Sequence, residues 1–108
     1  MYEPSKIITS FHISGFQHHD GVFLLDELKP GKKLAMVAEP DNPYDPSAIV
    51  LRYEGTKMGY VPRSENELLA QMMFFGHGGI FEARVQQVNP EADPWKQVRV
   101  GIYLVDNR

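Results

Sequence analysis

The sequence predicts a mainly β fold in which about six short strands and one clear helix form a small closed or half-closed barrel. Eight prolines and nine glycines in 108 residues indicate many turns and short elements. Alternating apolar and polar side chains recur in several short segments, whereas a helical apolar stripe is clear in only one. Because an open sheet of six strands would leave edges to be protected, closure with the helix across one open end is favoured.

Four of the expected strands lie in the first 61 residues. Residues 7–14 are rich in β-branched and aromatic types, as strands are. Residues 33–39 are apolar on both faces, which is typical of a strand that is covered on both sides. Residues 47–53 and 57–61 are the expected arms of a hairpin, because the Glu-Gly-Thr sequence at 54–56 is typical of a tight reversal.

Two helices are expected. The stronger spans about residues 64–76, where Ser64 and Glu67 have the spacing of a capping box, in which each side chain bonds the backbone N–H of the other residue. A single stripe of four apolar side chains follows, made of Leu68, Leu69, Met72 and Met73. A second, short helix is expected at about residues 22–28, with Asp20 as its cap.

The last part of the chain is expected to hold two strands separated by a loop with two prolines. From Phe81 to Val85 apolar and polar side chains alternate, and Val88 breaks this phase, which indicates a β-bulge. The final strand presents four apolar side chains on one face: Val98, Val100, Ile102 and Leu104.

Composition indicates a single domain over residues 1–108. The chain contains no cysteine, which excludes a disulfide framework and a thiolate metal site. Eleven Lys and Arg residues against fourteen Asp and Glu residues give a net charge of −3, so any nucleic-acid binding must come from a small local site. No apolar run approaches the ~20 residues of a membrane span, and residues 1–4 do not resemble a signal peptide, so we expect a cytoplasmic protein without a membrane partner.

No motif in the sequence indicates an enzyme, a metal site or a bound cofactor. His18-His19-Asp20 is the best candidate metal cluster, but neighbouring residues on a strand point to opposite faces, so both imidazoles cannot easily share one ion. The phosphate-binding GxxxxGK[ST] loop is absent. Ser14-Gly15 lacks the glycine pattern of a nucleophile elbow. We therefore expect a noncatalytic protein with no cofactor and no small-molecule substrate.

The most informative segment runs from Glu39 to Arg63 and reads EPDNPYDPSAIVLRYEGTKMGYVPR. It places an aromatic ring, Tyr44, and a carboxylate, Asp45, on a loop that three prolines stiffen. Because a rigid loop loses little entropy on binding, such a loop is suited to a binding site. A simpler interpretation stays open at this point, in which Asn42 and Asp45 only cap turns through side-chain hydrogen bonds.

This segment resembles the signature of the HIRAN domain family. The family pattern joins an acidic-Pro-x-Asn-Pro-aromatic-Asp loop to a Gly-aromatic-aliphatic-Pro-basic stretch, and residues 39–49 and 59–63 match the two parts. Residues 13–16 and Gly21 resemble the family's opening strand and loop, so the resemblance covers nearly the whole chain. Such domains occur as stand-alone bacterial proteins and as the N-terminal module of SNF2 ATPases of the helicase-like transcription factor type.

The resemblance implies an OB-like or SH3-like β-barrel that binds single-stranded DNA at a free 3′-hydroxyl end, in DNA repair or processing. Carried over by position, Tyr44 stacks on or walls the terminal base, and Asp45 contacts the 3′-hydroxyl. Tyr60 lies near the phosphate, and Arg63 contacts it. The hydrolase or ATPase activity of larger members belongs to other domains, so the resemblance implies no catalysis by this chain.

Three further positions are expected at the DNA site, and two of them depart from the family pattern. Asn42 belongs to the loop motif, whereas Gln17 and His18 stand where DNA-binding members carry an arginine followed by a tyrosine. The missing positive charge favours an alternative function. In that alternative the chain is a noncatalytic protein-interaction or regulatory module, which keeps the fold, has lost DNA-end binding and acts on a protein partner.

Overall fold

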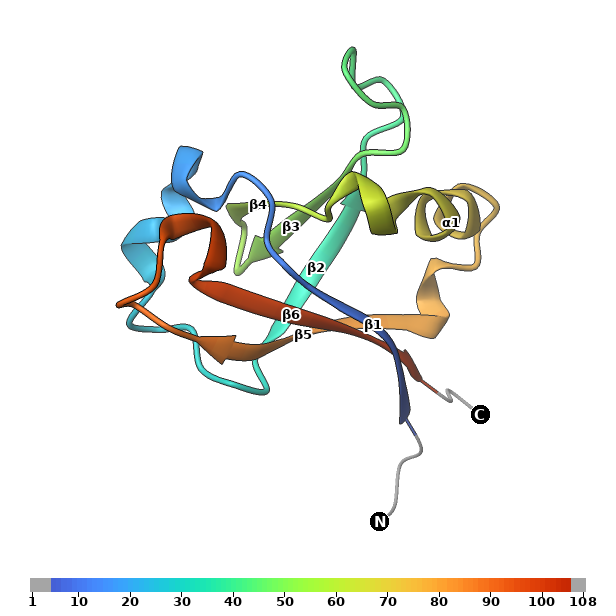
Figure 1. Cartoon of the computed structure of the whole chain (residues 1–108). Helices are drawn as coiled ribbons and strands as arrows, with labels where there is room; N and C mark the ends of the chain where they lie inside the picture. The colour runs from blue at the N-terminus through green and yellow to red at the C-terminus, as the bar shows by residue number, and fades with distance from the viewer. Residues whose placement is uncertain (1–4, 106–108) are drawn as a thin grey trace.

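The computed structural model describes residues 5–105, which form one six-stranded antiparallel sheet with one α-helix (Figure 1). The elements are β1 (Ser5–His12), β2 (Lys33–Ala38), β3 (Ile49–Tyr53), β4 (Thr56–Tyr60), α1 (Arg63–Phe74), β5 (Phe81–Val88) and β6 (Val98–Val105). The strand order across the sheet is β1-β6-β5-β2-β3-β4. The predicted mainly β fold with six strands and one clear helix is confirmed.

The outer strands of the sheet, β1 and β4, meet at one point just beyond the end of β1. Ser14 and Tyr60 exchange two backbone hydrogen bonds, each with an N···O distance of 2.9 Å. At Gly59, where φ is +144°, a Cβ would lie 2.5 Å from Ile13 Cγ2 and 2.6 Å from the carbonyl oxygen of Ser14. Glycine is needed for so close an approach of two backbones, and here it lets the two ends of the sheet meet through a single bridge.

The core lies inside the curved sheet and is closed by α1 and by the segment that follows β1. Its fully buried side chains come from most of the chain and include Ile13, Phe16, Leu28, Ile49, Leu51, Met58, Val61, Val85, Val98, Val100 and Ile102. From α1, Leu69 is buried but Leu68 is 66% exposed, so the helical stripe is narrower than predicted. Leu104 is 39% exposed because this end of β6 runs out beside β1, away from the core (Figure 1).

Helix α1 begins earlier than the sequence predicts. Its N-cap is Pro62 and no side chain caps it, so the predicted capping box of Ser64 and Glu67 is wrong. The φ angle of Pro62, −58°, is already that of a helix, and its carbonyl accepts a 2.9 Å hydrogen bond from the backbone N–H of Glu65. Ser64 therefore lies within the first turn. Within residues 5–105 there is no helix with the length and apolar character needed to span a membrane.

The short helix predicted at about 22–28 is present only in part, as a 3₁₀ helix that begins earlier and ends at Leu24. The segment after β1 holds two 3₁₀ helices, η1 (Phe16–His18) and η2 (Asp20–Leu24), and a turn follows Leu24. A Cβ on Gly21 would lie 2.7 Å from the Met58 sulfur, so η2 packs tightly against β4. Two turns of α-helix have little stability of their own, and this tertiary packing sets the local geometry instead.

Two further 3₁₀ helices, η3 (Gly78–Ile80) and η4 (Pro94–Lys96), precede β5 and β6. The pairing of β5 with β6 shifts register between Val85 and Gln87, which confirms the bulge predicted from the break in alternation.

Candidate nucleic-acid interface

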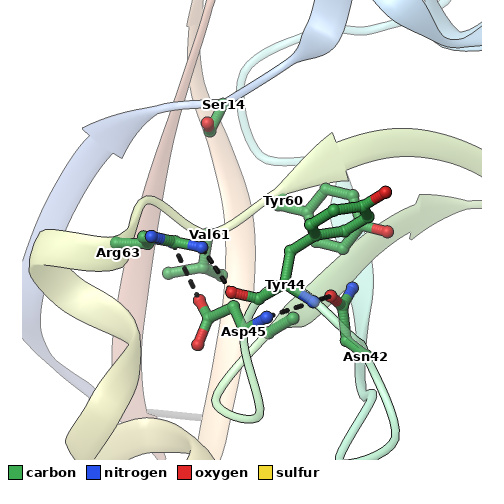
Figure 2. Close-up of a pocket in the computed structure, with 8 residues that line it drawn as sticks. Ser14, Asn42, Tyr44, Asp45, Tyr60, Val61 and Arg63 are labelled. Carbon is green, nitrogen blue, oxygen red and sulfur yellow. Dashed lines mark hydrogen bonds and ion pairs between the residues drawn. The ribbon is translucent and has the colours of Figure 1, made fainter.

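A cavity of about 250 Å³ lies where the 39–48 loop, the end of β4 and the start of α1 come together (Figure 2). Its lining residues are Ser14, Asn42, Tyr44, Asp45, Ala48, Tyr60, Val61 and Arg63. Five of the seven residues predicted for the DNA site are among them, and they come from three separate segments of the chain. The volume of the cavity lies just below the ~300–1,000 Å³ that is typical of small-molecule sites.

Asn42 gives the loop its shape. Its Oδ1 accepts hydrogen bonds from the backbone N–H groups of Tyr44 (2.9 Å) and Asp45 (3.1 Å). Its Nδ2 donates to Oε1 of Glu39 at 3.1 Å. The turn-capping role that the sequence left open is therefore present, and it holds Tyr44 and Asp45 in fixed positions at the cavity. Capping and binding are compatible in this loop, because the capping side chain supports the two candidate binding residues.

The Asp45 carboxylate is fixed by the backbone and by α1. Oδ1 accepts a 2.9 Å hydrogen bond from the backbone N–H of Ser47, and Oδ2 accepts one of 2.8 Å from the side-chain amide of Asn66. Arg63 Nε lies 3.6 Å from Oδ2. The Asn66 hydrogen bond, followed by that of Ser47, lowers the pKa of Asp45 below its ordinary value of 3.8. Asp45 is thus an ionised acceptor at neutral pH, and a carboxylate has acceptor capacity for a further donor.

Arg63 borders the cavity beside Asp45. Its Nη2 donates a 2.5 Å hydrogen bond to the carbonyl oxygen of Tyr44, which ties the first residue of α1 to the loop. The side chain is nevertheless 72% exposed. A guanidinium carries five N–H donors, so several stay available to a ligand.

Two tyrosines form the aromatic part of the site. Tyr44 is 84% exposed, so its ring is open to contact with a ligand. The Tyr60 hydroxyl is engaged on both sides: it accepts from Lys57 Nζ at 2.8 Å and donates to Glu39 Oε1 at 3.1 Å. Because Glu39 also binds Asn42, this carboxylate joins β4 to the loop that carries Tyr44.

The two remaining predicted residues, Gln17 and His18, lie outside the cavity. Both are exposed on η1 and neither lines the cavity. The next residue, His19, makes the contact with the site instead, with its ring edge-on to Tyr60 at 6.0 Å between centroids. Burial and then the charge of Lys57 lower the pKa of His19 below its ordinary value of 6.5. Among residues 5–105, no three His, Asp or Glu side chains converge in the manner of a metal site.

Sequence reasoning missed the residues that support the site. Asn66 follows Arg63 by three positions, a spacing that puts two side chains on one face of a helix, so the pair could have been predicted from α1 alone. Glu39 and Lys57 lie inside the conspicuous segment 39–63, but their link through Tyr60 depends on how β4 packs beside the loop. Ser14 joins the cavity only through the long-range bridge to Tyr60.

Two larger hollows lack the combination of an available cation, a carboxylate and an exposed aromatic ring that the cavity at Tyr44 has. One of about 740 Å³ lies between α1, β1 and β6, and its lining is mostly apolar with two glutamates and no Lys or Arg. Another of about 480 Å³ contains Lys33, but an ion pair of 3.2 Å with Glu82 engages this lysine. The cavity at Tyr44 joins a cation, a carboxylate and exposed aromatic surface, and it is therefore the candidate functional site.

The HIRAN domain family matches residues 8–105, nearly the full length of the chain. The chain belongs to the HIRAN domain family. HIRAN is a binding domain, and the family is associated with DNA binding. A search of curated proteins finds no match.

Two solved structures resemble this HIRAN domain closely in fold. A protein from Lactobacillus plantarum superposes with a TM-score of 0.77 and 19% identity, over 98% of this chain and all of the other. The HIRAN domain of human HLTF superposes with a TM-score of 0.62 and 20% identity, over 94% of this chain and 77% of the other. At these identities the likeness establishes the fold, and residue roles must come from the site itself.

Proposed function

We propose that this HIRAN domain binds single-stranded DNA at a free 3′-hydroxyl end. One arrangement carries the proposal: the Asp45 carboxylate and the Arg63 guanidinium lie together at the cavity, with the exposed ring of Tyr44 beside them (Figure 2). A carboxylate accepts a hydrogen bond from a hydroxyl, a guanidinium binds phosphate and an aromatic ring stacks on a base. In this proposal the 3′-hydroxyl of the terminal nucleotide contacts Asp45, its phosphate contacts Arg63 and its base stacks on Tyr44.

A carboxylate in a DNA site selects ends by repulsion as well as attraction. A terminal 3′-hydroxyl donates a hydrogen bond to Asp45. An internal nucleotide carries a phosphodiester at the same position, which has no donor and adds a negative charge next to the carboxylate. The same group therefore favours a chain end and rejects the middle of a strand. The low pKa of Asp45 keeps this discrimination active throughout the neutral range.

A site that contacts only a few phosphates is compatible with the negative net charge of this protein. Stacking of one base on an aromatic ring contributes ~1–3 kcal/mol and tolerates any sequence. On single strands each phosphate contact adds about −0.7 to the slope of the logarithm of the binding constant against the logarithm of the salt concentration. Two phosphate contacts should therefore give a slope of about −1.4. A net charge of −3 is compatible with so short a footprint.

The remaining predicted residues have lesser roles in this proposal. Asn42 positions Tyr44 and Asp45, since both ends of its amide are used within the loop. Gln17 and His18 lie outside the cavity and are contacts for the strand beyond the terminal nucleotide. The chain is assigned binding without catalysis. Recognition of free 3′ ends connects it to DNA repair or processing, in which such ends arise.

Chemical-shift mapping tests the proposal. Isotope-labelled protein is titrated with a short oligonucleotide that ends in a 3′-hydroxyl, and we expect the largest shifts at Tyr44, Asp45, Tyr60 and Arg63. Shifts confined to the apolar hollow between α1 and β1 would contradict the proposed location. If no residue shifts at low salt, the domain does not bind DNA ends, and the alternative of a protein-interaction module takes the place of this proposal.

A further inference from the structure

Lys57 lies on the far side of Tyr60 from the Asp45–Arg63 pair. Its Nζ is 2.8 Å from the Tyr60 hydroxyl and 4.6 Å from the centroid of the ring. Figure 2 shows the phenol oxygens of Tyr44 and Tyr60 pointing away from Arg63. Lys57 does not line the cavity itself, but because it donates to one of these oxygens, its ammonium group lies next to the cavity residue Tyr60, at the hydroxyl end of that side chain.

The charges around Lys57 favour an anion. Among residues 5–105, no carboxylate forms an ion pair with it within 4.0 Å. The nearest acid in this network, Glu39, accepts hydrogen bonds from Tyr60 and Asn42 instead. Arg52 is the direct partner of Lys57 across the β3–β4 hairpin and carries a second positive charge, although its Nη1 donates a 3.0 Å hydrogen bond to the carbonyl oxygen of Gly55 in the turn. Two like charges in direct cross-strand positions are unfavourable on their own, and an anion bound beside them would relieve their repulsion.

The position of Lys57 also bears on the departure at Gln17. Gln17 is one of the residues expected at the DNA site, and its side chain carries no charge. The η1 segment that holds Gln17 packs against β4, the strand that holds Lys57. Lys57 therefore provides a positive charge on the side of the cavity where η1 lies.

We propose that Lys57 forms a second phosphate subsite for single-stranded DNA. The subsite receives the phosphodiester next along the strand from the one at Arg63, so that the strand leaves the cavity across the Tyr60 ring. This inference rests on the proposed binding of 3′ ends and adds the direction and the length of the footprint. It makes Lys57 the second of the two phosphate contacts assumed above.

Paired ligands of two lengths test the subsite. A thymidine dinucleotide with a free 3′-hydroxyl and no terminal phosphate offers one phosphodiester, and the matching trinucleotide offers two. Between 50 and 200 mM salt, trinucleotide affinity of the unmodified protein should fall about 7-fold, for a slope of about −1.4. With Lys57→Ala the fall should be about 2.6-fold, for a slope of about −0.7, because one phosphate contact is gone.

Three further variants separate charge from packing. Lys57→Met keeps an apolar stem against Tyr60 and should give the lower slope, whereas Lys57→Arg should restore the higher one. Lys29→Ala removes an exposed cation that does not line the cavity and should leave the higher slope unchanged.

The outcomes distinguish the two proposals. If the unmodified protein binds neither ligand, the proposed function itself fails. If it binds both and Lys57→Ala or Lys57→Met keeps a slope near −1.4 for the trinucleotide, end binding stands and the Lys57 subsite is wrong.

Discussion

The side-chain amide of Asn66 donates a 2.8 Å hydrogen bond to Oδ2 of Asp45, across 21 residues of sequence. Asn66 is 3% exposed, so a buried residue of α1 sets the orientation of the carboxylate at the cavity. Arg63, one helical turn earlier, approaches the same oxygen. The position of α1 therefore determines both charged groups of the candidate site, and the helix links the stability of the fold to the geometry of binding.

Replacing Asn66 should loosen Asp45. In Asn66→Ala the pKa of Asp45 should rise towards 3.8, because its largest stabilising contact is gone. The free energy of unfolding should fall by about 1–2 kcal/mol, as is common when a buried, hydrogen-bonded side chain is removed. Carboxyl-carbon NMR titration and chemical denaturation measure the two effects. Asn89→Ala, in the loop before β6, should leave the pKa of Asp45 unchanged. An unaltered Asp45 titration in Asn66→Ala would show that the hydrogen bond is unimportant.

Tyr44 should contribute to binding and very little to stability. Its ring is 84% exposed, so Tyr44→Ala should change the free energy of unfolding by less than about 0.5 kcal/mol. Loss of base stacking should weaken oligonucleotide binding about 5- to 150-fold, which corresponds to ~1–3 kcal/mol. Tyr44→Phe should retain most of the affinity. Phe75→Ala, another exposed ring just beyond the opposite end of α1 from Arg63, is the matched control. Equal losses for the Tyr44→Ala and Phe75→Ala variants would mean that Tyr44 has no special role.

Gly59 should tolerate no side chain. Gly59→Ala combines a positive φ with overlap against the backbone of Ser14, and should destabilise the domain by about 2–5 kcal/mol. Gly31→Ala is a control for φ alone, since Gly31 has φ +94° and a Cβ added there would meet no atom within 4 Å. This control variant should cost about 1–2 kcal/mol. Thermal or chemical denaturation gives both values. Similar losses for the two variants would contradict the close approach of β4 to the chain after β1.

Acid should weaken the fold partly through Asp45. Hydrogen bonds from Asn66 and Ser47 lower the pKa of Asp45 in the folded state. A lowered folded-state pKa contributes stability above the unfolded-state pKa of ~3.9, and that contribution is lost as pH falls through the folded-state value. Asp45→Asn should therefore destabilise the protein at pH 7, and the difference from the unmodified protein should shrink below about pH 4. Thermal unfolding from pH 2 to pH 7 tests this, and a difference independent of pH would count against it.

Local patterns in the sequence were sufficient to predict most of the strands. Alternation identified β5 and β6, together with the bulge near Gln87, because side chains on a strand alternate strictly between two faces. The bounds and the 3₁₀ geometry of the short helix predicted at 22–28 could not be obtained in this way, since packing of Gly21 on Met58 determines that segment. The start of α1 was misplaced because a plausible capping box competed with Pro62.

In the candidate site, too, residues that are close in the sequence could be predicted, whereas those placed by long-range packing could not. Tyr44, Asp45, Tyr60 and Arg63 lie in one stretch of chain, and a rigid loop followed by a hairpin brings such neighbours together. Gln17 and His18 were placed by resemblance alone, and the position of η1 depends on long-range contacts such as the bridge between Ser14 and Tyr60. The supporting residue Asn66 was missed, although its spacing from Arg63 within α1 places both side chains on one face of the helix beside Asp45.

The central claim is that Asp45 selects a chain end. Fluorescence anisotropy with two 5′-labelled oligonucleotides, identical except for a 3′-hydroxyl or a 3′-phosphate, tests it most directly. We predict that the unmodified protein binds the 3′-hydroxyl strand at low salt and shows no measurable binding to the 3′-phosphate strand. Asp45→Asn should narrow this difference, because an amide does not repel phosphate. Equal affinity of the unmodified protein for the two strands would contradict the account.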